Sequence, residues 1–88
     1  MRREYHPNAW LTGFRNVRPG LERRTKILRQ LERGAATVKR LSSDMGTPDS
    51  TVRYHLRHLE ARGIIARVAS KPPFTWKVTP IGQQRLTL

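Results

Sequence analysis

The chain has 88 residues, which is enough for one domain with a small core and too short for a catalytic domain with a deep cleft. It carries 18 lysines and arginines against 6 aspartates and glutamates, and this formal net charge of +12 favours a polyanionic partner, nucleic acid ahead of an anionic membrane. Cysteine is absent, which excludes disulfides and thiolate metal sites.

No segment of the sequence is apolar enough to direct the chain to a membrane. Arg2 and Arg3 begin a charged leader, but no apolar stretch of the signal-peptide type follows them. No run of apolar residues approaches the length of a membrane span. The sequence therefore predicts a soluble protein that resides with the nucleoid in the cytoplasm, or in the nucleus of a eukaryote.

Prolines and glycines interrupt residues 1–20, which show no clean helical or strand period. The segment is nevertheless too apolar for a disordered tail; its apolar side chains include Tyr5, Trp10, Leu11, Phe14 and Val17. We interpret residues 1–20 as a basic, aromatic arm with a short helical turn around residues 8–14, which docks on the domain or on a second copy. Together with the apolar end Leu86-Thr87-Leu88, the arm predicts a homodimer, because both offer apolar surface that needs burial.

The domain itself is predicted to occupy residues 21–88 and to begin with a helix that Gly34 ends. Its inward face consists of residues at helical spacing, namely Leu21, Thr25, Ile27, Leu28 and Leu31. The remaining surface of the helix is charged and carries Glu22, Arg23, Arg24, Lys26, Arg29 and Arg33.

A second helix is predicted after a very short strand at residues 35–36. Thr37 is placed to cap its N-terminus, because a threonine hydroxyl accepts a hydrogen bond from a free backbone N–H there. The inward residues of this helix are Val38, Leu41 and Met45. Its outward residues are Lys39, Arg40 and Ser43.

Gly46-Thr47-Pro48 indicates a compact turn into a third helix over residues 48–62, which Gly63 stops. Gly46 supplies the left-handed conformation that a helix C-terminus favours. Thr47 is expected to be the N-cap of the third helix and Pro48 its first residue. The inward stripe of this helix is Val52, Leu56 and Leu59, and the opposite side carries Ser50, Arg53, Tyr54 and Arg57.

Beyond Gly63 the period changes to that of strands. Residues 64–69 and 74–78 are rich in β-forming side chains and are separated by Ser70-Lys71-Pro72-Pro73, which predicts a hairpin. Phe74, Trp76 and Val78 alternate onto one side of the second strand, where we expect a lid over the core. Thr79-Pro80 then opens a short terminal helix that runs through Leu86.

Three helices followed by a two-stranded hairpin resemble the winged helix-turn-helix family, in particular the MarR/ArsR-like transcriptional regulators. The matching segments are Thr37-Val38-Lys39-Arg40-Leu41, Met45-Gly46, residues 50–56, Leu59-Glu60, Arg62-Gly63-Ile64-Ile65 and residues 76–82. The resemblance covers residues 21–86. It implies a mainly α fold with a small β-hairpin (α+β): a three-helix core, a wing and a short C-terminal helix. It also implies that the third helix enters the major groove of DNA while the wing touches the flanking backbone or minor groove.

The side chains on these elements suit contacts with DNA. Arginine can bind guanine through two hydrogen bonds in the major groove, and serine or threonine can bond either type of base. The second helix of such a motif crosses the backbone, and narrow minor grooves attract cations on a wing. The predicted DNA-contact residues are Lys39, Arg40, Ser50, Thr51, Arg53, Tyr54, Arg57, Arg67, Lys71 and Lys77.

No constellation in the sequence supports catalysis or a metal site. A glycine-rich phosphate loop, a nucleophile elbow and a metalloprotease motif are all missing. His55 and His58 are three residues apart on one helix, but no third ligand has a convincing spacing. We therefore expect neither an enzyme nor a cofactor-binding or metal-binding protein.

The sequence is best interpreted as that of a transcriptional regulator that binds double-stranded DNA as a homodimer. Two alternatives remain open at this point. An abundant architectural or chromatin protein would coat DNA with little sequence preference, which the high charge favours and the polar outer side of the third helix disfavours. A winged-helix module could instead bind RNA or protein within a larger assembly.

Overall fold

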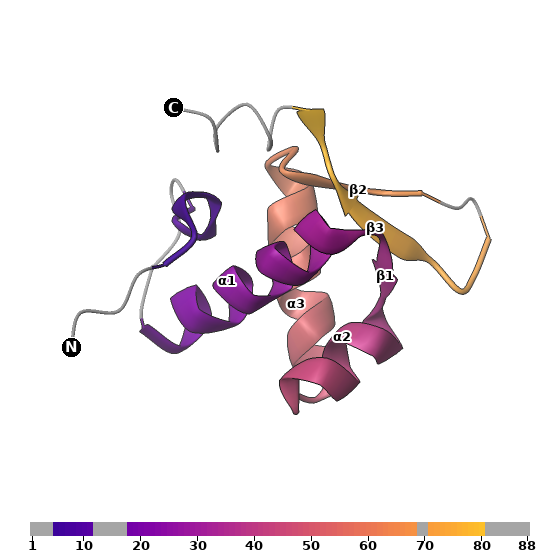
Figure 1. The fold of residues 1–88 in the computed structure, drawn as a ribbon, viewed down its shortest axis with the longest axis horizontal. Coiled ribbons are helices and arrows are strands. Elements are labelled where there is room, and N and C mark those ends of the chain that lie inside the picture. The colour runs from indigo at the N-terminus through magenta and orange to yellow at the C-terminus, as the bar shows by residue number, and fades with distance from the viewer. Residues whose placement is uncertain (1–4, 12–17, 69–70, 81–88) are drawn as a thin grey trace.

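The computed structural model describes residues 5–11, 18–68 and 71–80 and shows three α-helices packed with a small sheet (Figure 1). After a short 3-10 turn, η1 (Pro7–Ala9), the elements are α1 (Arg18–Arg33), β1 (Ala36–Thr37), α2 (Val38–Met45), α3 (Asp49–Ala61), β2 (Ile65–Arg67) and β3 (Thr75–Val78). The predicted mainly α fold with a hairpin is confirmed. The predicted terminal helix and the apolar end at residues 86–88 lie outside the described residues.

The core lies where the three helices meet the sheet. Every residue predicted to face inward from α1 is buried. The stripe of α3 is also buried, with Val52, Leu56 and Leu59 almost fully removed from solvent. In α2 the central Leu41 is buried, while Val38 and Met45 are partly buried and pack against the core. The helical periodicity of the sequence therefore identified the packing faces of all three helices.

Both predicted ends of α2 are confirmed, and the predicted start of α3 is wrong. The Thr37 side chain accepts a hydrogen bond from the Arg40 backbone N–H at 3.1 Å, and Gly46 has the left-handed φ of 62°. The N-cap of α3, however, is Pro48 rather than Thr47, and the helix begins one residue later than expected, at Asp49. The Thr47 hydroxyl instead donates to the Met45 carbonyl at 3.3 Å, so it closes the turn rather than capping the helix.

The sheet has the order β1-β3-β2, with both neighbours antiparallel to the central strand β3. Ala36 lies opposite Trp76 on one side of β3, and Ile65 lies opposite Val78 on the other. Trp76 and Val78 are buried against the core, as the predicted lid requires. Phe74 precedes the strand and is only half-buried. The hairpin of β2 and β3 is called the wing below.

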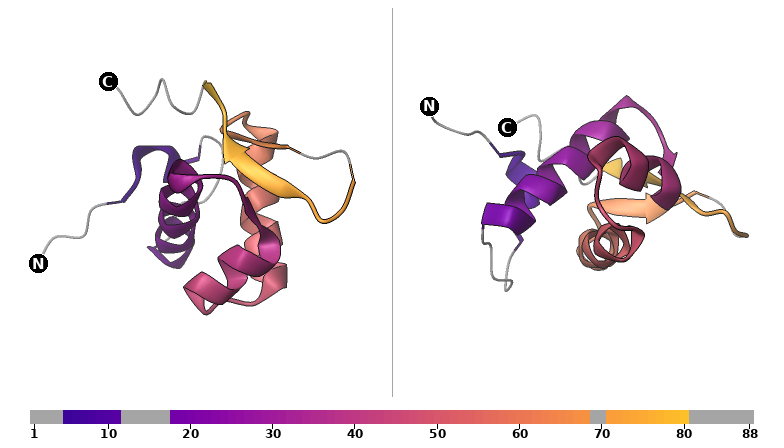
Figure 2. Two further views of the ribbon diagram at one scale, coloured as in Figure 1. Left: turned by 45° about the vertical axis from the view of Figure 1, so that its right-hand side comes forward. Right: turned by 90° about the horizontal axis from the view of Figure 1, so that it is seen from below.

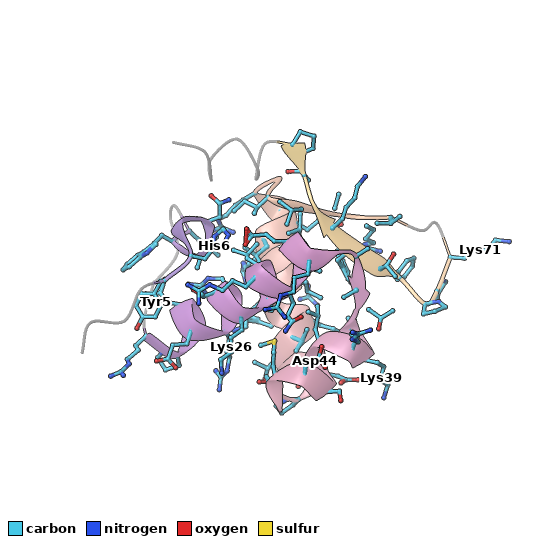
Figure 3. All side chains as sticks on the ribbon, in the orientation of Figure 1. Tyr5, His6, Lys26, Lys39, Asp44 and Lys71 are labelled. Atoms are coloured by element: carbon cyan, nitrogen blue, oxygen red, sulfur yellow. The ribbon has the colours of Figure 1, made fainter. Side chains whose placement is uncertain are left out.

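The arm packs on the domain's own first helix. Residues 5–11 run beside α1, as two views of the ribbon and the labelled Tyr5 and His6 show (Figures 2 and 3). Ala9 and Leu11 join the hydrophobic core. The His6 backbone N–H donates to the Thr25 hydroxyl at 3.0 Å, and Nε2 of the same histidine lies 3.2 Å from a carboxylate oxygen of Glu32.

The arm also explains why one prediction about α1 is wrong. The charge of Arg24 predicts a place on the outer surface of the helix, but its side chain is fully buried. Its Nε donates a hydrogen bond of 2.7 Å to the Ala9 carbonyl, which covers this turn of the helix. Gly20 makes room for the guanidinium, since a Cβ at that position would lie 2.9 Å from Nη1. The helix itself begins at Arg18, three residues before the predicted start.

Candidate nucleic-acid interface

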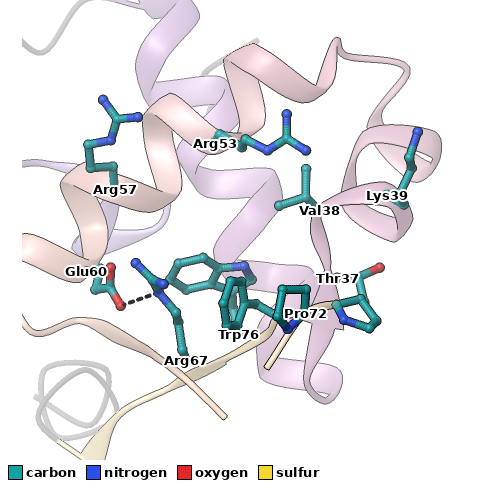
Figure 4. Close-up of a pocket in the computed structure, with 11 residues that line it drawn as sticks. Thr37, Val38, Lys39, Arg53, Arg57, Glu60, Arg67, Pro72 and Trp76 are labelled. Carbon is teal, nitrogen blue, oxygen red and sulfur yellow. Dashed lines mark ion pairs between the residues drawn. The ribbon is translucent and has the colours of Figure 1, made fainter. Parts of the chain in front are cut away.

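The third helix and the wing enclose a groove of about 450 Å³ (Figure 4). We call it the helix–wing groove. Its walls include Lys39 at the start of α2, Arg53 and Arg57 on α3, and Phe74 and Trp76 of the wing, with Thr37 of β1 at the edge. The apolar stripe of α3 is buried in the core, and the flank of the helix that carries Arg53, Arg57 and Glu60 is turned toward the wing.

Four of the ten predicted contact residues line the helix–wing groove, namely Lys39, Arg53, Arg57 and Arg67. The other six lie outside it: Ser50, Tyr54, Arg40, Lys71 and Lys77 are exposed and Thr51 is half-buried. The structure therefore places the cations of α2, α3 and β2 around one concavity. Contact of any of these residues with DNA stays a prediction.

The floor of the groove is aromatic and holds one arginine in place. The Arg67 guanidinium lies 4.9 Å from the ring centre of Phe74 and 5.2 Å from that of Trp76, within the range of cation–π attraction. Its Nε is 3.3 Å from a carboxylate oxygen of Glu60 on α3. Arg67 thus connects the wing to α3. Glu60 and Phe74 could not be identified from the sequence, because their role depends on how the wing folds back onto α3.

The acidic residues divide the cations of the surface into two classes. Within the described ranges every acidic side chain lies beside a basic one: Glu22 with Arg18, Glu32 with His6, Asp44 with Arg40, Asp49 with Lys39 and Glu60 with Arg67. Three predicted contact residues, Lys39, Arg40 and Arg67, therefore already have an internal partner. A hydrogen bond from Ser42, followed by the charge of Lys39, lowers the pKa of Asp49 and keeps that carboxylate ionised.

The remaining predicted cations have no such partner. In residues 5–11, 18–68 and 71–80, no acidic side chain forms an ion pair with Arg53, Arg57, Lys71 or Lys77. Arg53 and Arg57 are one helical turn apart and both border the helix–wing groove. Among the predicted contact residues, the cations without an internal ion pair therefore lie on the groove side of α3 and on the wing.

The histidines of α3 belong to the helix packing. Tyr54 is 46% exposed, and its ring meets the rings of His55 and His58 edge-on at 5.2 and 4.6 Å. His55 itself is buried, and this burial, together with the charge of Arg24, lowers its pKa to about 4. The imidazole is consequently neutral at pH 7. Across the part of the chain that the structure describes, no three His, Asp or Glu side chains are grouped to hold a metal ion.

The helices of the described segments are also too short or too polar to cross a lipid bilayer.

A family model described as a helix-turn-helix domain matches residues 23–68 of the chain. No curated protein matches the chain. Among solved structures, the chain is similar to the Zα domain of Carassius auratus PKZ in complex with Z-DNA, with a TM-score of 0.62 and 22% identity. That match covers 66% of this chain and 94% of the Zα chain.

Two bacterial structures have the same fold. The homodimeric winged helix-turn-helix DNA-binding domain of a candidate ArsR-family regulator from Mycobacterium bovis has a TM-score of 0.67 and 18% identity, over 75% of this chain and 62% of that chain. A mutant of ZitR from Lactococcus lactis has a TM-score of 0.66 and 16% identity, over 89% of this chain and 56% of that chain. The chain thus has the winged-helix fold and spans only 56–62% of these two relatives.

The buried histidine predicts a specific pH dependence of stability. The pKa of His55 is about 4 in the fold and 6.5 in the unfolded chain. Above pH 6.5 the imidazole is therefore neutral in both the folded and the unfolded chain, and its burial costs no stability there. As the pH falls from 6.5 to 4, only the unfolded chain takes up the proton, which lowers the free energy of unfolding by about 3 kcal/mol. Denaturant unfolding at several pH values measures this loss.

His55→Gln should flatten the pH profile, whereas the matched variant His58→Gln, at a more exposed position, should keep most of it. Identical pH profiles for wild type and His55→Gln would contradict the assignment of a buried neutral imidazole.

Proposed function

The chain belongs to a family of helix-turn-helix domains, and on this premise we propose that it is a transcriptional regulator that binds double-stranded DNA. In this proposal α3 enters the major groove, and the wing lies on the flanking backbone or minor groove. The observation that carries the proposal is the helix–wing groove, with the unpaired cations Arg53 and Arg57 on its α3 wall. No catalytic role is proposed, and the protein would reside where the DNA is, in the nucleoid or a nucleus.

The outer side of α3 has the shape and chemistry for a major groove. The helix has 13 residues and is therefore about 20 Å long. A major groove admits an α-helix, and arginine reads guanine there through two parallel hydrogen bonds. Arg53 and Arg57 are the candidates for this role, with Ser50 and Tyr54 beside them on the exposed surface. Thr51 is half-buried and would contribute only at the edge of the contact.

The cations on α2 and the wing would hold the phosphate backbone. Lys71 and Lys77 are exposed and free of acidic partners in the described ranges, so they can bind phosphate directly. Lys39, Arg40 and Arg67 would exchange an internal carboxylate for a phosphate. This exchange costs little, because an exposed ion pair stabilises a fold by only about 0–1 kcal/mol.

The first test measures the base-reading role of α3. Arg53→Ala and Arg57→Ala should each weaken binding to a selected duplex by about 1–3 kcal/mol and weaken binding to random duplex less. Duplexes selected from a random pool at about 150 mM salt supply the target, since non-specific binding is weak at that salt concentration. Arg33→Ala removes the same charge from α1 and serves as the matched control, with little expected change in affinity for one duplex.

The same titrations separate the competing functions. Equal losses of affinity for selected and random duplex would indicate that Arg53 and Arg57 contact phosphates and not bases. A wild-type protein that fails to discriminate between the two duplexes would indicate an architectural DNA-coating protein. Because the Zα domain of Carassius auratus PKZ is in complex with Z-DNA, the panel includes a duplex held in the left-handed form, together with an RNA hairpin. Preference for the RNA hairpin would overturn the proposal.

We propose in addition that the protein acts as a homodimer, with the arm and the C-terminal end at the interface. One recognition helix reads few base pairs, and two linked half-sites read more. The similar Mycobacterium bovis domain is homodimeric. In the described part of the arm, Ala9 and Leu11 are buried on their own domain, whereas Trp10 is 49% exposed with its ring edge-on to Tyr5 at 6.1 Å. Trp10 is therefore the described side chain best placed to meet a second copy.

The dimer predicts different effects for two neighbouring substitutions. Trp10→Ala should leave the fold stable, convert the dimer to monomer in sedimentation, and reduce affinity for a two-half-site duplex by at least tenfold. Leu11→Ala is the matched control. Removal of this buried side chain leaves a cavity and should lower the free energy of unfolding by about 2–5 kcal/mol. A Trp10→Ala protein that sediments like wild type would contradict an interface at Trp10.

A further inference from the structure

Three cations form a stripe along the solvent side of α1. Arg23, Lys26 and Arg33 are all exposed. At about 100° per residue they lie within about 80° of one another around the helix axis, and at 1.5 Å per residue they extend over about 15 Å. None of them lines the helix–wing groove. We call this surface the α1 stripe.

No side chain of the α1 stripe forms an ion pair with an acidic side chain of the described residues. Every acidic side chain in the described ranges is paired with a different residue, and neither Glu22 nor Glu32 on the same helix forms an ion pair with Arg23, Lys26 or Arg33. Like charges along one side of a helix repel one another weakly, and in the described part of the fold no ion pair offsets this repulsion. An external anion would remove it.

The α1 stripe also lies away from the surface proposed for the first duplex. Seen from the helix–wing groove, α1 runs behind α3 (Figure 4). The buried side of α1 faces the core, so the charged stripe is turned outward. A duplex seated in the groove would therefore leave the α1 stripe accessible.

The chemistry of the stripe favours a nucleic acid over a protein partner. Protein interfaces usually rely on apolar or aromatic anchors. The large apolar side chains exposed in the described ranges are Trp10, Tyr54 and Val68, and none of them is on α1. A surface of charge alone suits the regular phosphates of a duplex, which carries one negative charge per about 1.7 Å of its axis.

From these observations we propose that the α1 stripe binds the phosphate backbone of a second DNA duplex, so that the protein bridges two DNA segments. The inference rests on the proposed function for the first duplex. Binding at the stripe would be independent of sequence, because the contacts are to phosphate alone. It would also weaken with salt, by about 0.9 in the slope of log K against log salt for each phosphate contact.

A capture experiment tests the bridge. Bead-bound selected duplex is incubated with the full chain and a labelled second duplex, and the recovered label is measured at about 150 mM salt. The test variant is Arg23→Gln/Lys26→Gln/Arg33→Gln. It should bind the bead duplex within about threefold of wild type, since the groove is intact, but lose at least tenfold of the captured label.

Two controls keep the outcome unambiguous. Because Trp10→Ala is expected to bind the selected duplex more weakly, it is added at a concentration that restores wild-type occupancy of the beads. At equal occupancy it should capture as much second duplex per bound chain as wild type, because the stripe and the groove belong to one chain; loss of capture at equal occupancy would assign bridging to the dimer and overturn the inference. Arg53→Gln/Arg57→Gln should weaken binding to the bead duplex itself. Wild type that occupies the bead duplex without capturing the second, or a stripe variant that captures normally, overturns the inference alone. Failure of wild type to bind any duplex overturns the proposed function with it.

Discussion

The packing of α3 against α1 is the contact on which the rest of the structure depends. Val52, Leu56 and Leu59 are buried in the core that α3 shares with α1 and α2, and their burial fixes the rotation of α3 about its own axis. Once that rotation is set, Arg53 and Arg57 must face the wing, and the wing strand β3 closes the core with Trp76. The helix–wing groove is therefore a consequence of core packing. A rotation of α3 by one residue would move its cations away from the groove and bury a polar side chain instead.

Charge organises the surface that packing leaves exposed. With 18 basic residues and 6 acidic ones, the chain cannot neutralise itself. The acidic side chains pair locally with Lys39, Arg40 and Arg67 around the proposed backbone contacts, and in the described ranges they form no ion pair with Arg53 or Arg57. Such a distribution orients a long-range attraction toward the groove while internal pairs hold the surrounding cations in position. The excess on α1 extends the same argument to a second surface.

The sequence predicted the helices and helix ends that depend on neighbouring residues. It did not predict the contacts that depend on residues far along the chain. Helical periods identified the core of α1, α2 and α3, and Thr37 and Gly46 identified the ends of α2. Arg24 shares the inward side of α1 with Leu21 and Leu28, but its charge argued for solvent. The Ala9 carbonyl, 15 residues away, accepts a hydrogen bond from the Arg24 guanidinium and so helps to make its burial acceptable. The ion pair of Glu60 with Arg67 likewise forms only when the wing is folded. The sequence therefore named four residues that line the groove, but it could not predict how they are arranged around it.

The central claim is that the helix–wing groove receives duplex DNA, and an NMR titration tests it most directly. Amide resonances of the isotope-labelled full chain are followed as a selected duplex is added up to one equivalent per chain. The account predicts that the largest shifts fall on the groove wall at Arg53 and Arg57 and on the wing from Arg67 to Trp76, with smaller changes in the buried side of α1. Saturation of the duplex with the groove resonances unmoved would contradict it.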